Sequence, residues 1–173
     1  MLKTKSYTSS LGKPEIGLSM LFCLGESFPS LLKHLQKVDL RHVEIVDEGS
    51  HALSDRRVKA LKRVAQSKDV ELAVHAPIAG INIALPSPVL RRAILKRLEK
   101  SIFYAAQLNC RLWLFHPGLQ TGVSHFYPGL DWRVNLDSVR TLLKIGRKEG
   151  VEIAIENVPE PYPFILKNVQ DFS

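Results

Sequence analysis

Residues 111–118 read Arg-Leu-Trp-Leu-Phe-His-Pro-Gly, an apolar run that ends in a polar residue and is followed at once by turn-forming residues. The same form occurs at residues 71–77, Glu-Leu-Ala-Val-His-Ala-Pro, and at residues 152–159, Glu-Ile-Ala-Ile-Glu-Asn-Val-Pro. Short apolar runs bounded by Pro or Gly are typical of strands buried in a parallel sheet. These segments therefore predict three strands, each with a polar side chain at its carboxyl end.

Further strands and helices alternate with these three segments along the chain. The helical pattern is clearest over residues 88–108, where Ser87 suits the N-cap and Pro88 suits the first helical position. Strict alternation of strands and helices is typical of a parallel sheet built from βα units. The predicted strands are 16–19, 42–46, 71–75, 111–116 and 152–157, and the predicted helices are 28–37, 54–67, 88–108 and 134–149, with a fifth helix beginning near Phe164.

Five parallel strands fit either an open doubly wound sheet or part of a closed barrel. An open nucleotide-binding sheet usually carries a glycine-rich loop after its first strand, but residues 19–22 here read Ser-Met-Leu-Phe. The predicted fold class is therefore α/β, a partial TIM (β/α) barrel with about five of the eight βα units. A complete barrel takes about 250 residues, so we expect this chain to lack roughly three units. Residues 15–173 should form this single domain, after a leader at residues 1–14 that we expect to be disordered.

The composition limits the classes of protein to which this chain can belong. A chain of 173 residues with 45% hydrophobic content can bury a core, which argues against disorder. Its apolar stretches fall short of the roughly 20 residues that a membrane span needs, and residues 6–10 are polar where a signal peptide is apolar. We therefore expect no membrane partner and a cytoplasmic location.

The isolated Cys23 and Cys110 are predicted to be reduced core residues. The net charge of +7 suits a phosphorylated substrate or nucleic acid, but is also common in other soluble proteins.

Three polar residues end consecutive predicted strands: His75, His116 and Glu156. In a parallel barrel the carboxyl ends of the strands form the active-site face, so these side chains should converge. One such histidine alone is more often a hydrogen-bonded core residue, but a carboxylate after an apolar strand needs a cation or strong donors nearby. Two imidazoles and a carboxylate match the ligands of a divalent metal ion, Zn or Mn first and Mg or Co as alternatives. The sequence therefore predicts a metal site at these three residues.

The motifs at residues 74–77 (Val-His-Ala-Pro), 115–118 (Phe-His-Pro-Gly) and 155–159 (Ile-Glu-Asn-Val-Pro) stand in this order about forty residues apart. In this they resemble the xylose isomerase-like TIM-barrel superfamily, which joins sugar isomerases and epimerases with abasic-site nucleases of the endonuclease IV type. In the nuclease branch, the resemblance implies that His75, His116 and Glu156 are all metal ligands, with the carboxylate bridging two ions. In the isomerase branch it implies that Glu156 is a ligand and an acid or base, while the histidines shape the substrate pocket. The superfamily's later strands add further ligands, and this sequence contains no counterpart to them.

The leading hypothesis is a divalent-metal-dependent sugar or sugar-phosphate isomerase or epimerase, with Glu156 as the catalytic residue. The alternative is a zinc-dependent abasic-site nuclease that binds DNA. Against it, only Trp132 and Arg133 provide an aromatic and basic pair in the predicted loop after strand four. A second alternative is an inactive half-barrel that serves as an assembly module and self-associates through its open sheet edge.

Four other polar residues are weaker candidates for the site. Glu44 should face the barrel interior, where it either touches the substrate or makes an internal hydrogen bond. His51 and His125 are predicted in loops on the active-site side, either lining a pocket or simply exposed. Glu160, between two prolines, is predicted to lie in a rigid surface turn.

Overall fold

The computed structural model describes residues 16–158 and 161–172. The predicted leader at residues 1–14 and the predicted turn at Glu160 lie outside the described residues.

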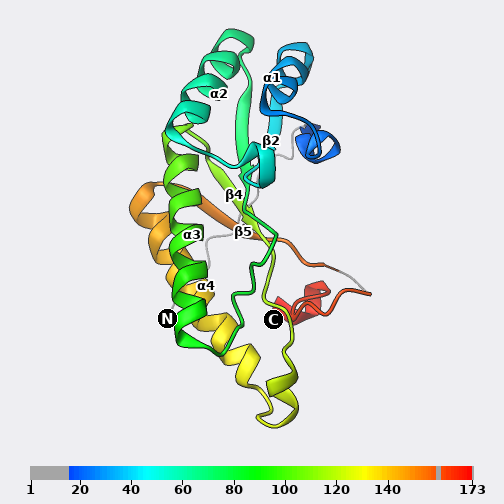
Figure 1. Cartoon of the computed structure of the whole chain (residues 1–173), viewed down its shortest axis with the longest axis vertical. Coiled ribbons are helices and arrows are strands. Elements are labelled where there is room, and N and C mark those ends of the chain that lie inside the picture. Colours follow the sequence, from blue (N-terminus) through cyan, green and yellow to red (C-terminus); the bar gives the residue numbers. More distant parts are fainter. Residues whose placement is uncertain (1–15, 159–160, 173) are drawn as a thin grey trace, which may run out of the picture.

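Five parallel strands form one sheet whose spatial order follows the chain, β1-β2-β3-β4-β5 (Figure 1). In a doubly wound sheet the strand order reverses at a switch point, whereas in a TIM barrel each new strand is added to the same edge. The predicted α/β partial barrel is therefore confirmed. The strands are β1 (Gly17–Ser19), β2 (His42–Val46), β3 (Glu71–His75), β4 (Leu112–Phe115) and β5 (Glu152–Ile155).

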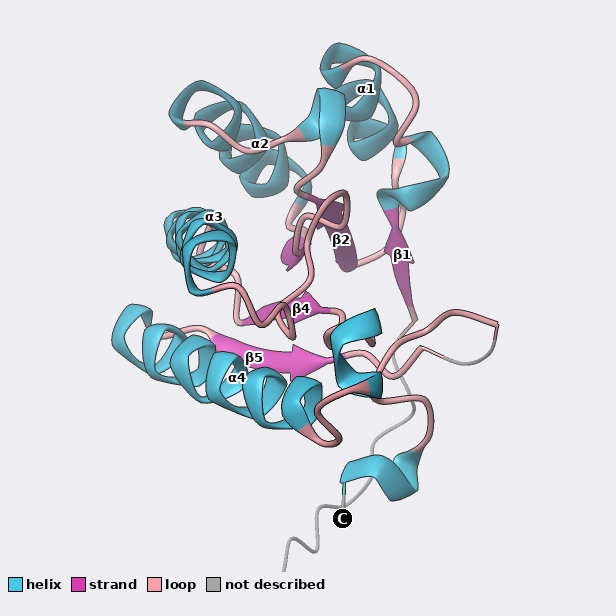
Figure 2. Ribbon diagram, turned by 60° about the horizontal axis from the view of Figure 1, so that its bottom comes forward, coloured by secondary structure: helices cyan, strands magenta, loops and turns pink. Residues whose placement is uncertain are grey.

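Four α-helices lie along one side of this curved row of strands (Figure 2). Serine N-caps begin two of them: the Ser27 side chain accepts a hydrogen bond from the Ser30 N–H, and the Ser54 side chain accepts one from the Arg57 N–H. Gly150 ends the fourth helix with a φ of 74°, a left-handed conformation that favours glycine. The helices are α1 (Phe28–Lys37), α2 (Asp55–Lys68), α3 (Pro88–Gln107) and α4 (Leu130–Glu149).

The two faces of each strand have different roles, as β4 shows. Trp113 and Phe115 are fully buried in the core between sheet and helices, and the Trp113 indole N–H donates to Ser101 Oγ of α3 at 3.0 Å. Leu112 and Leu114 alternate with them and are only half-buried on the inner face. Because side chains alternate along a strand, His116 continues the inner face at the carboxyl end of β4.

The predicted fifth helix at Phe164 is wrong. Phe164 instead forms an isolated antiparallel bridge with Leu119, and the only helical turn beyond it among the described residues is the 3-10 segment η4 (Val169–Phe172). The backbone N–H of Ile165 donates to the Gly118 carbonyl at 2.9 Å, so this segment satisfies its hydrogen bonds against another part of the chain.

The fourth helix begins at Leu130, four residues before the predicted start at residue 134. Gly129, at a φ of 76°, makes the turn that permits this earlier start. Asp131 in the first helical turn accepts hydrogen bonds from the Thr121 N–H at 2.6 Å and the Thr121 hydroxyl at 2.9 Å. Trp132 and Arg133 therefore lie in the helix and not in the loop where the sequence placed them.

Both cysteines are buried and unpaired, as predicted. Burial raises the pKa of the Cys110 thiol to about 12, so this residue is an inert core group. No helix among residues 16–158 and 161–172 combines the length and apolar character needed to cross a membrane.

Candidate metal centre

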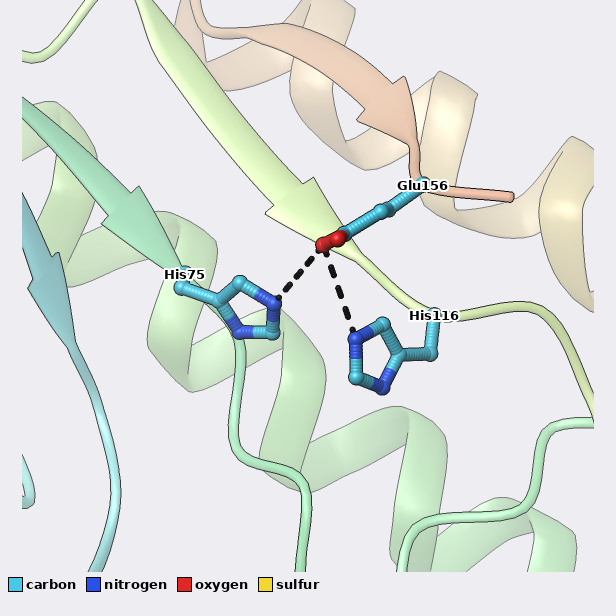
Figure 3. Close-up of side chains that lie close together, drawn as sticks. All are labelled: His75, His116 and Glu156. Carbon is cyan, nitrogen blue, oxygen red and sulfur yellow. Dashed lines mark hydrogen bonds and ion pairs between the residues drawn. The ribbon is translucent and has the colours of Figure 1, made fainter. Parts of the chain in front are cut away.

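Three polar side chains meet at the carboxyl ends of three neighbouring strands (Figure 3). His75 is the last residue of β3, while His116 and Glu156 directly follow β4 and β5. Phe115 is in register with Ile155, so His116 and Glu156 come next to each other on adjacent strands. The Glu156 N–H donates to the Phe115 carbonyl at 3.0 Å and extends this register by one residue. The sheet therefore brings together the three residues predicted from the sequence.

One carboxylate oxygen faces both imidazoles. Glu156 Oε2 lies 3.3 Å from His75 Nε2 and 3.5 Å from His116 Nε2. The two rings meet edge to face, with centroids 4.9 Å apart and planes at 77°. His75 is almost fully buried, with 8% of its side chain exposed, whereas 49% of the Glu156 side chain is exposed. The cluster therefore has a buried histidine at its base and a carboxylate open to solvent.

The hydrogen bonding of His75 leaves two acceptors facing each other. His75 Nδ1 lies 2.8 Å from the Ala76 carbonyl oxygen, which can only accept, so Nδ1 must carry a proton. In the neutral ring Nε2 is then an acceptor, yet it points at the carboxylate oxygen of Glu156. Two acceptors at 3.3 Å need a proton or a metal ion between them.

His116 is in an environment that favours its neutral form. Burial lowers the pKa of His116, the nearby His75 lowers it further, and the negative charges of Glu156 and Glu44 oppose this shift. A neutral imidazole is the form that binds metal.

The donor set and its spacing fit a small divalent ion. Two ligand atoms at the usual zinc distances in a tetrahedral site are about 3.4 Å apart. The nitrogen-to-oxygen separations here are 3.3 and 3.5 Å, and all three potential ligand atoms lie within 4.8 Å of one another. Three protein ligands with an exposed side are also the pattern of catalytic zinc sites, which keep a position for water or substrate.

Two acidic residues that the sequence analysis missed hold the chain around this cluster. Asp47 is fully buried, accepts hydrogen bonds from both terminal nitrogens of Arg97 at 2.8 Å, and accepts another from the Leu53 N–H at 2.7 Å. Its own N–H donates to the His75 carbonyl at 2.9 Å. Asp47 therefore ties the end of β3, and with it His75, to α3.

The neighbouring Glu48 fixes the turn that follows His75. Its carboxylate accepts hydrogen bonds from the N–H groups of Ile78 at 2.8 Å and Ala79 at 2.7 Å. Burial alone would raise the pKa of Glu48, but these two N–H groups, that of Gly49 and the charge of Arg97 hold the pKa below its usual range. Asp47 and Glu48 both follow the apolar end of β2, so the rule that selected His75 and His116 could also have selected them.

The weaker candidates do not join the cluster. Glu44 accepts a hydrogen bond from the Ser19 hydroxyl at 2.6 Å, which is the internal bond that the sequence left as one alternative. His51 is fully buried in the 3-10 segment η2 (Gly49–His51), so the alternative of a simply exposed loop histidine is wrong. His125 ends the exposed 3-10 segment η3 (Gly122–His125), where its ring contacts Phe126.

Comparison with known sequences gives a family match over most of the chain. The sequence model of the family described as "Xylose isomerase-like TIM barrel" matches residues 32–172. An uncharacterized protein of Methanocaldococcus jannaschii, MJ1311, is 28% identical over 145 residues, which is 84% of this chain and 50% of that protein. The chain thus spans about half the length of the curated relatives it matches.

Solved structures repeat the same architecture. A D-tagatose 3-epimerase-like protein superposes with a TM-score of 0.80 at 26% identity, covering 87% of this chain and 55% of that one. Endonuclease IV from Thermus thermophilus superposes with a TM-score of 0.63 at 15% identity, covering 92% of this chain and 57% of that one, a likeness of fold alone.

Proposed function

This chain belongs to the xylose isomerase-like TIM-barrel family, and from that premise we propose that it forms the metal-binding part of a sugar or sugar-phosphate isomerase or epimerase. The observation that carries the proposal is the pair of facing acceptors, His75 Nε2 and Glu156 Oε2, with His116 Nε2 beside them. The similarity to a D-tagatose 3-epimerase-like protein favours sugar chemistry over the alternatives.

The metal ion and the three residues have different roles in the proposed reaction. When bound, a divalent ion would hold neighbouring oxygens of a sugar and make the adjacent C–H or O–H more acidic. His75 and His116 would provide neutral nitrogen ligands from the buried side of the site. Glu156 would be the third ligand, and its half-exposed carboxylate would accept the substrate proton and return it.

Loading the purified chain with Zn²⁺ or Mn²⁺ and adding ketohexoses or ketose phosphates in D₂O tests this proposal. We expect deuterium to enter the sugar at the carbon next to the carbonyl, because that proton exchanges with solvent while Glu156 holds it. Proton NMR of the sugar measures the exchange. Removing the metal with EDTA should stop the exchange, and restoring the metal should recover it. A metal-loaded chain that exchanges no proton in any ketose would contradict the proposal.

A zinc-dependent abasic-site nuclease is the second candidate, because both histidines converge on the carboxylate as the nuclease branch of the superfamily would require. The shift of Trp132 and Arg133 into α4 removes the one aromatic and basic pair assigned to a DNA-binding loop. A duplex oligonucleotide with one abasic site separates the candidates. Cleavage that depends on zinc, with affinity falling steeply as salt rises, would favour the nuclease.

We also propose that the open sheet is covered by a second copy of this chain. Within the described residues β1 pairs only with β2 and β5 only with β4, so each edge strand has a free side. The half-buried inner face, which includes Leu112 and Leu114, adjoins a cavity of about 740 Å³. Unpaired parallel strand edges favour association.

Sedimentation velocity over a range of concentrations should therefore show reversible self-association. Leu114→Glu on the inner face should shift the equilibrium toward monomer. Phe103→Glu, at an exposed apolar residue on the outer helix α3, is the matched control and should leave it unchanged. A chain that stays monomeric at every concentration would rule this assembly out.

A further inference from the structure

The two histidines of the candidate metal centre are oriented in different ways. His75 is fixed by the hydrogen bond from its Nδ1 to the Ala76 carbonyl at 2.8 Å. For His116 Nδ1, the described part of the chain provides no such hydrogen bond. Its ring instead touches two aromatic rings: His75, with centroids 4.9 Å apart, and Phe164, with centroids 5.2 Å apart and planes at 70°.

Phe164 is itself held in place by the backbone around it. It lies in the segment 161–166, which turns back after β5 and pairs with the chain that follows His116. The Gln120 N–H donates to the Pro163 carbonyl at 2.8 Å and the Ile165 N–H to the Gly118 carbonyl at 2.9 Å, on either side of the bridge between Phe164 and Leu119. The Phe164 backbone is therefore held beside the chain that follows His116.

The chain that follows His116 is anchored on its other side as well. The Asn82 side chain accepts from the Leu119 N–H at 2.9 Å and donates to the Leu119 carbonyl at 3.1 Å. The Val158 N–H donates to the Leu166 carbonyl at 3.2 Å and closes the turn after Glu156. Two of the three proposed ligands, His116 and Glu156, are thus followed by chain segments that pair with residues 161–166.

We propose that Phe164 is a positioning residue for His116: its ring takes the place of the outer hydrogen bond that usually orients a metal-binding histidine. This inference rests on the proposed metal function and adds a residue to it. Edge-to-face aromatic contacts have a preferred geometry and contribute beyond simple burial. The outer partners of metal-bound histidines typically contribute 10- to 100-fold to metal affinity, and an apolar contact should lie near the lower end of about tenfold.

Zinc affinity measured by competition with a coloured chelator tests this role. Phe164→Leu keeps an apolar side chain at this position but removes the ring, so we expect the dissociation constant for Zn²⁺ to rise about tenfold. Phe164→Tyr keeps the ring and should bind zinc like the unaltered chain. Phe126→Leu is the matched control: it makes the same change at an exposed residue whose ring contacts His125, outside the metal cluster. It should leave the zinc affinity unchanged.

A double-mutant cycle with His116→Gln separates positioning from a general loss of structure. If Phe164 acts through His116, adding Phe164→Leu to His116→Gln should weaken zinc binding no further. The visible spectrum of bound Co²⁺ should change with Phe164→Leu and return with Phe164→Tyr. The inference would be overturned if Phe164→Leu weakened zinc binding equally with His116 and with His116→Gln. It would also be overturned if Phe164→Leu left the zinc affinity of a zinc-binding chain unchanged. If the unaltered chain binds no zinc, the proposed metal function fails first and the inference falls with it.

Discussion

Replacing Glu156 with glutamine is expected to weaken Zn²⁺ binding by about a hundredfold or more, because the amide removes the negative charge that faces both imidazoles. Loss of an outer partner alone often lowers metal affinity 10- to 100-fold, and Glu156 is a proposed direct ligand. Proton exchange in a ketose should fall by about a hundredfold or more as well, since the same carboxylate is the proposed base. Zinc competition and deuterium incorporation measure the two losses separately.

The fold should tolerate this change, since 49% of the Glu156 side chain is exposed. Glu152→Gln is the matched control: it alters an exposed glutamate at the opposite end of the same strand, where the partner is Arg111 at 3.7 Å. Its zinc affinity and thermal unfolding should match those of the unaltered chain. A Glu156→Gln protein that retains full zinc affinity would remove this residue from the metal site.

Replacing Asp47 with alanine is expected to lower the free energy of unfolding by about 3 kcal/mol, because it removes a fully buried carboxylate from an ion pair and leaves its hydrogen-bond donors unsatisfied. The Leu53 N–H loses its acceptor, and Arg97 loses two hydrogen bonds at 2.8 Å. Urea unfolding monitored by circular dichroism measures the change. Alanine keeps the backbone N–H that donates to the His75 carbonyl, but this backbone loses its side-chain tie to Arg97 of α3, so zinc affinity should also fall in the fraction that remains folded.

An exposed ion pair of the same residue types provides the comparison. Asp137 and Arg140 on α4 are 3.1 Å apart, with 64% and 69% of their side chains exposed. Asp137→Ala should change the free energy of unfolding by less than about 1 kcal/mol, because solvent screens such pairs. Equal effects of the two substitutions would show that burial of Asp47 contributes nothing.

Local sequence signals predicted the start of a helix but not the conformation of the loops. The start of α3 at Pro88 was predicted correctly because its signal is local: a serine at the N-cap and a proline at the first helical position. The segment 161–166 gave no such signal. Its pairing partner, residues 118–120, lies more than forty positions away, and that pairing excluded the predicted helix at Phe164. Likewise, the burial of His51 depends on how η2 packs, which no pattern of neighbouring residues indicates.

The sequence by itself determined the parallel alternation of strands and helices and the positions of His75, His116 and Glu156 at three strand ends. Strand periodicity and terminating turns are encoded over a few residues, and the shared direction of parallel strands places their ends at one edge. Only the tertiary structure decided that one oxygen of Glu156 faces both imidazoles, that Asp47 pairs with Arg97, and that Phe164 stands against His116. These contacts join residues far apart in the chain, and their distances follow from strand register and side-chain packing, which the order of residues does not reveal.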